Sequence, residues 1–110
     1  MLAAHYAPKT PATLVARGAL HAEVGQLAER DEAIAVLART VARPPEFSDM
    51  WINAPIDPAA YAHDLYANLR TLDNANADAI LIEAVPPGAE WLAIRDRLER
   101  ATRGEDDDRD

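Results

Sequence analysis

Four polar side chains could do chemistry together because each follows, or closes, a predicted strand: Arg17, Arg39, Asn53 and Glu83. In an open parallel sheet the carboxyl ends of the strands lie along one edge, and ligands bind there. The four residues therefore form a candidate small-molecule site, although ordinary loop polarity is the simpler explanation for them. No glycine-rich phosphate loop accompanies them, and no lysine follows position 9, which argues against a P-loop nucleotide site.

Glu83 is the one charged side chain inside an apolar strand segment. A buried carboxylate needs a charged or hydrogen-bonding partner, and Arg70 or Arg95 could supply one. The sequence therefore favours a structural role for Glu83, as an anchor at the end of its strand, over a catalytic one.

Three histidines, His5, His21 and His63, are the only imidazoles of the chain. No two of them have the spacing of metal ligands, so we expect no metal site. His63 precedes Asp64, but neighbouring side chains on a helix diverge around its axis, and we expect this pair not to meet. His21 and His63 are predicted at the surface. The chain has no cysteine, and no catalytic residue is predicted.

These side chains must be positioned by alternating strands and helices. Apolar runs predict four strands, over residues 13–16, 33–38, 50–53 and 78–83. Periodic apolar positions predict three helices, over residues 20–31, 58–73 and 91–103. The clearest helix start is Asp57-Pro58, where Asp57 can cap the helix and Pro58 loses no hydrogen bond. This order predicts an α/β fold with a mainly parallel sheet of about four or five strands and helices on both faces. The weaker strand 50–53 suits an edge of that sheet.

Composition and length point to one domain with flanking segments. The 110 residues carry a net charge of −8, and residues 104–110 form an acidic tail that we expect to be disordered. Residues 1–11 are interpreted as a linker, because Pro8 and Pro11 exclude helix there. The domain then spans residues 12–103. The negative charge argues against direct binding of nucleic acid, and no apolar run is long enough for a membrane span. A cytoplasmic protein is expected.

Two segments resemble a known family. The linker segment Leu2–Pro8 is similar to the segment that joins the two domains of long-form L-threonylcarbamoyladenylate synthases. The run Tyr61–Asp73 resembles the signature helix of their C-terminal domain, and the strand Ala77–Glu83 and the helix segment Ile94–Leu98 continue the match. The resemblance reaches to about Thr102.

The resemblance implies a Rossmann-like, three-layer accessory domain without chemistry of its own. In such enzymes a YrdC-type domain binds ATP, L-threonine and bicarbonate, and forms the threonylcarbamoyl adenylate used in tRNA modification. ATP and Mg²⁺ thus belong to that partner domain, which we expect to be absent here, and no cofactor is expected in this chain. In relatives the linker can lie over the catalytic pocket as a lid. By position, His5, Tyr6 and Pro8 would be lid residues.

The sequence therefore predicts a non-catalytic regulatory or docking domain of a threonylcarbamoyl-AMP synthase, which positions a lid-like linker over a YrdC-type catalytic domain. One alternative is a sensor that binds a nucleotide or an amino acid at the carboxyl edge of the sheet. Another is a homo-oligomer formed through the linker or through an exposed edge strand.

Overall fold

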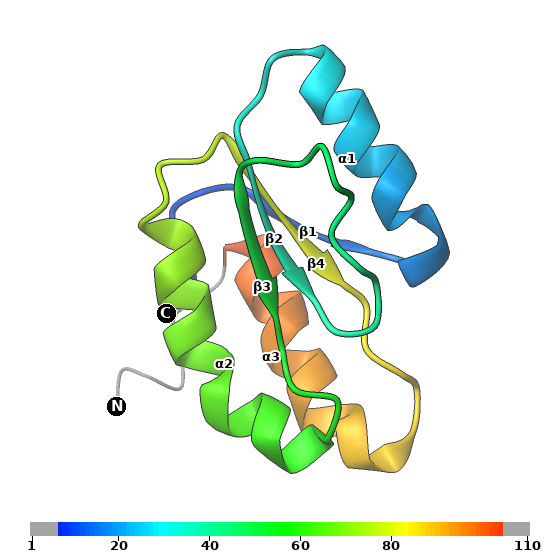
Figure 1. The fold of residues 1–110 in the computed structure, drawn as a ribbon. Helices are drawn as coiled ribbons and strands as arrows, with labels where there is room; N and C mark the ends of the chain where they lie inside the picture. Colours follow the sequence, from blue (N-terminus) through cyan, green and yellow to red (C-terminus); the bar gives the residue numbers. More distant parts are fainter. Residues whose placement is uncertain (1–6, 105–110) are drawn as a thin grey trace.

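The computed structural model describes residues 7–104. Its strands and helices follow the predicted order (Figure 1). They are β1 (Ala12–Val15), α1 (Leu20–Glu29), β2 (Ile34–Ala38), β3 (Met50–Asn53), α2 (Pro58–Asp73), β4 (Ala79–Glu83) and α3 (Leu92–Arg103). Short 3-10 turns, η2 (Arg17–Ala19) and η3 (Ala89–Trp91), lead into α1 and α3. The first helix ends two residues earlier than predicted, because Asp31 adopts a left-handed backbone with φ of 60°.

The four strands form one parallel sheet in the order β1-β4-β2-β3. The predicted α/β class with a parallel sheet is confirmed, and β3 lies at an edge as expected. Strand β2 lies between β4 and β3, and every one of its five residues is buried. A parallel strand that is covered on both faces has this continuous apolar character.

Helices cover both faces of the sheet. Ile34, Val36 and Ala38 of β2 pack in a core cluster with apolar residues of α1. The alternate residues Ala35 and Leu37 pack in a second cluster with residues of α2 and α3. The result is the predicted three-layer sandwich, in which α1 lies on one face and α2 and α3 lie on the other (Figure 1).

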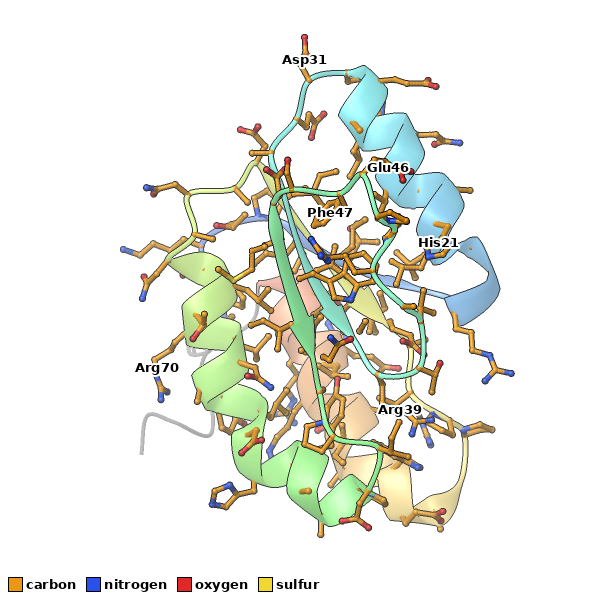
Figure 2. All side chains as sticks on the ribbon, in the orientation of Figure 1. His21, Asp31, Arg39, Glu46, Phe47 and Arg70 are labelled. Carbon is orange, nitrogen blue, oxygen red and sulfur yellow. The ribbon has the colours of Figure 1, made fainter. Side chains whose placement is uncertain are left out.

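The connection from β2 to β3 contains no helix, although parallel neighbours are usually joined by one. Residues 39–49 instead run over the α1 face, where Phe47 is buried (Figure 2). Its ring meets that of Trp51 edge-on, with 5.3 Å between the ring centroids. An aromatic side chain on a loop therefore covers β3 beside α1, a role that the sequence reading had not predicted.

The start of α2 is capped as the sequence predicts. The Asp57 carboxylate accepts a hydrogen bond from the Ala60 backbone N–H at 3.0 Å, and Pro58 occupies the first turn. None of the helices within residues 7–104 is long and apolar enough to cross a membrane.

Replacing Asp57 by alanine should lower the free energy of unfolding by about 1 kcal/mol, because the Ala60 N–H loses its acceptor. Urea denaturation followed by circular dichroism measures this change. The matched variant Asp57→Asn keeps a capping oxygen and should retain nearly the parent stability. Equal losses in the two variants would contradict the capping role.

Candidate functional site

Three of the four predicted edge residues lie together. Arg17, Arg39 and Glu83 line an open cleft of about 450 Å³ at the carboxyl ends of β1 and β4. From β1 the chain turns to α1 on one face of the sheet, and from β4 it turns to α3 on the other face. The cleft therefore lies where parallel α/β sheets open a crevice. Asn53 does not line it, and its side-chain oxygen accepts a hydrogen bond from Trp51 Nε1 at 3.3 Å.

Glu83 is buried and accepts hydrogen bonds from the turn that follows β2. Its Oε1 accepts from the backbone N–H groups of Arg39 at 2.7 Å, Thr40 at 2.9 Å and Val41 at 3.2 Å. Its Oε2 accepts from the Thr40 hydroxyl. The carboxylate thus ties the end of β4 to the turn after β2. This agrees with the predicted anchoring role.

The expected partners of Glu83 were wrong. Arg95 donates to the carbonyl oxygens of Pro86 at 3.0 Å and Gly88 at 3.2 Å. Arg70 is exposed on α2 and points away from the sheet (Figure 2). A turn whose successive backbone N–H groups face one point can stabilise a buried carboxylate without a guanidinium. Such a turn leaves no charged residue in the sequence to mark it.

The pKa of Glu83 is set by two opposed effects. Burial raises it, but the hydrogen bonds from the Thr40 hydroxyl and from the three backbone N–H groups outweigh burial and hold the pKa below its ordinary value of 4.5. Glu83 is therefore ionised at neutral pH, with both oxygens engaged inside the protein. A carboxylate held in this way is not available as a general acid or base.

Arg39, which lines the cleft, also contacts the loop after β3 and the ring of Trp91. The Arg39 guanidinium donates to the Ile56 carbonyl at 2.9 Å and lies 4.8 Å from the centroid of the Trp91 ring. Tyr61 meets Trp91 edge-on at 5.4 Å. Arg39, which follows β2, thus connects the segment after β3 with the segment after β4.

The hydroxyl of Tyr61 is poorly suited to proton transfer. Burial raises the pKa of Tyr61 strongly, the Glu83 carboxylate raises it further, and Arg39 opposes both weakly. Within residues 7–104 neither the Tyr61 hydroxyl nor Arg39 Nε has a hydrogen-bond partner. The phenol therefore stays neutral and serves the core.

A second polar contact lies at the opposite edge of the sheet, where sequence reasoning had placed nothing. Asp73, the last residue of α2, accepts hydrogen bonds from the backbone N–H groups of Lys9 at 3.2 Å and Thr10 at 3.0 Å. It also accepts from the Thr10 hydroxyl at 2.8 Å. Of the predicted lid residues, Pro8 is buried, and His5 and Tyr6 lie outside the described residues.

The position of Asp73 was the one signal that could have revealed this contact. The carboxyl end of a helix carries partial negative charge, so helix stability alone favours a cation there. An aspartate at the last helical position therefore calls for another role.

His21 and His63 lie in neither the cleft nor the Asp73 contact. His63 Nδ1 lies 3.0 Å from Asp64 Oδ1, so the expectation that these neighbours do not meet was wrong. Both side chains turn outward, and their rotamers bring the tips together although the Cβ atoms diverge; the His63 side chain is 86% exposed. His21 is on the surface as predicted and pairs with the Ala42 carbonyl at 2.9 Å. Within residues 7–104 no cluster of three or more histidine or acidic side chains could hold a metal ion.

A family model described as threonylcarbamoyl-AMP synthase, C-terminal domain, matches residues 1–102. The chain belongs to this family. No curated protein matches the chain. Membership connects this C-terminal domain with a synthase of tRNA modification whose catalytic part is a YrdC domain. The match includes both the Glu83 anchor and the Asp73 contact.

Replacing Glu83 in this synthase domain by leucine should lower the free energy of unfolding by about 3 kcal/mol, because four donors lose their acceptor in a buried place. Chemical denaturation measures the loss. The Glu83→Gln variant keeps an oxygen for the three N–H groups and should lose clearly less. If glutamine were as damaging as leucine, the charge rather than the hydrogen bonding would be decisive.

The same anchor predicts how stability depends on pH. Because the pKa of Glu83 is lower in the folded chain than its ordinary 4.5, the folded state binds fewer protons in this range. The stabilisation is complete above pH 4.5 and is lost as pH falls through the lowered pKa. Denaturation between pH 6 and pH 3 should show a drop in the parent that is smaller in Glu83→Gln. Identical slopes would exclude this contribution.

Proposed function

We propose that this chain is a non-catalytic docking domain that positions a lid-like linker over a YrdC-type catalytic domain. The observation that carries the proposal is the fixed end of the linker, where Lys9 and Thr10 are held by Asp73 at the end of α2. A linker that leaves a rigid domain at a defined point can be moved by that domain. A linker tethered loosely could not.

The groups at the carboxyl edge support a non-catalytic role. Glu83 is engaged by four donors, Tyr61 has a raised pKa, and Arg39 is held by Ile56 and Trp91. Each of these contacts stabilises the fold. The binding of ATP, L-threonine and bicarbonate is therefore assigned to the catalytic domain.

A linker that is held at one end by this domain can act as a lid over an active site beside the docked domain. Movement of the domain would then open or close the site, which is a common way for a lid to control access of substrate and water.

The proposal is tested by adding the chain to a separately produced YrdC-type catalytic domain of a long-form synthase, or by joining the two. Pyrophosphate release from ATP, L-threonine and bicarbonate is measured. The chain alone should release none above background, because within residues 7–104 the titratable groups at the carboxyl edge, Glu83 and Tyr61, are not available for proton transfer. The joined protein should show substrate KM values shifted from those of the catalytic domain alone.

Two results would contradict the proposal. Pyrophosphate formed by the chain alone would show that it is catalytic. Unchanged KM values in the joined protein would show that the domain does not act on the active site.

The cleft supports a second candidate function, the sensing of a nucleotide or an amino acid. It brings Arg17 and Arg39 to one hollow of about 450 Å³, and Arg17 is exposed there. Calorimetry of the chain alone with ATP, AMP and threonine separates the two functions. A docking domain gives no heat of binding with these ligands. A sensor gives a heat of binding, and the Arg17→Ala variant should lower the affinity for the ligand about tenfold or more.

A further inference from the structure

We propose that Asp73 is a positioning residue for the synthase: its carboxylate clamps Lys9 and Thr10, and so fixes where the linker leaves the domain and which end of the domain faces the catalytic partner. The inference rests on the proposed docking function and makes it specific. It names the residue that couples the domain to the linker.

The contact has the form of a clamp because it involves both oxygens of one carboxylate. Oδ1 accepts from the Thr10 backbone N–H and from the Thr10 hydroxyl, at 3.0 and 2.8 Å. Oδ2 accepts from the Lys9 backbone N–H at 3.2 Å. Hydrogen bonds to an ionised acceptor are stronger than those between neutral groups. Two consecutive residues of the linker are thus held in position and in direction.

The clamp lies on rigid structure. Asp73 ends a helix of 16 residues whose buried face includes Leu69 and Leu72. Directly after Thr10 the chain joins the sheet, since the Pro11 carbonyl accepts a hydrogen bond from the Ile80 N–H at 2.8 Å. Pro8, directly before the clamp, is buried. The path of the linker is therefore defined on both sides of Lys9 and Thr10.

Helix stability gives no reason for an aspartate at this place. The partial negative charge at the end of α2 disfavours a carboxylate there. Removal of the Asp73 charge should therefore leave the helix itself intact and loosen the hold on the linker. This separates a positioning role from a general role in folding.

The clamp also distinguishes the two ends of the domain. Helix α2 runs back across the sheet from β3 to β4, so Asp73 lies at the edge where the strands begin, and the cleft of Arg17 and Glu83 lies where they end (Figure 1). A catalytic domain that receives the linker must approach the end marked by Asp73. The cleft then remains outside the docking face.

The chain contains its own reporter for the clamp. Lys9 is the only lysine of the sequence, so an endoprotease specific for lysine can cut the chain at one bond, between Lys9 and Thr10. The Thr10 N–H, which belongs to that peptide bond, and the Lys9 N–H of the preceding one both donate to Asp73. Cleavage of a folded protein requires local opening of the segment, and its rate follows the population of the open form.

The variants are Asp73→Ala, which removes the clamp, Asp73→Asn, which keeps one acceptor oxygen, and Asp64→Ala, a matched control on the same helix. None of them changes the sequence around the cleavage site. Cleavage at Lys9 should be about ten- to a hundredfold faster in Asp73→Ala than in the parent, intermediate in Asp73→Asn and unchanged in Asp64→Ala. Circular dichroism should show the same helix content in all of them.

The functional readout uses each variant joined to the catalytic domain. Asp73→Ala should abolish the shift in KM that the parent chain causes, Asp73→Asn should restore part of it, and Asp64→Ala should keep all of it. Unchanged cleavage at Lys9 would overturn the clamp, whatever the fate of the docking proposal. Faster cleavage with the full KM shift retained would overturn the positioning role and leave docking intact. A parent chain that shifts no KM would overturn docking, and the positioning role with it.

Discussion

The carboxylate of Glu83 is the constraint on which the carboxyl edge of the sheet depends. The turn after β2 presents three backbone N–H groups and the Thr40 hydroxyl toward the sheet, and each needs an acceptor. One buried glutamate at the end of β4 satisfies all four. Since β4 and β2 are neighbours in the sheet, this contact fixes the backbone of Arg39 at the end of β2. From there the Arg39 side chain reaches the Ile56 carbonyl and the Trp91 ring. The loops at this edge are therefore held together by Glu83.

The sequence was sufficient for the features that local pattern determines. The order of the elements, the capped start of α2 at Asp57 and the edge position of β3 follow from periodicity and from residue types, and the structure has all of them. The grouping of Arg17, Arg39 and Glu83 follows from the rule that parallel strands end at one edge. Asn53 also ends its strand at this edge, but β3 lies at the far side of the sheet from β1 and is separated from β4 by β2, so Asn53 does not line the cleft.

The features that the sequence could not supply depend on distant contacts or on rotamers. Thr10 and Asp73 are 63 positions apart, and no spacing in the chain connects them. The partners of Glu83 are backbone N–H groups of a turn. Every residue type except proline has such a group, so no residue in the sequence marks the turn as the partner of a carboxylate. The His63–Asp64 pair depends on side-chain rotamers beyond the helical geometry that was used to exclude it.

The two carboxylates divide the domain into a carboxyl edge, where Glu83 ties the loops together beside the cleft, and an opposite edge, where Asp73 holds the linker. This division is tested most directly by mapping the docking face in solution. Backbone amide signals of the labelled chain are followed by NMR while unlabelled YrdC-type catalytic domain is added. Signals of Lys9, Thr10 and the end of α2 should shift, and those around Arg17 and Val85 should not. Shifts centred on Arg17 and Val85, with Lys9 and Thr10 unaffected, would contradict it.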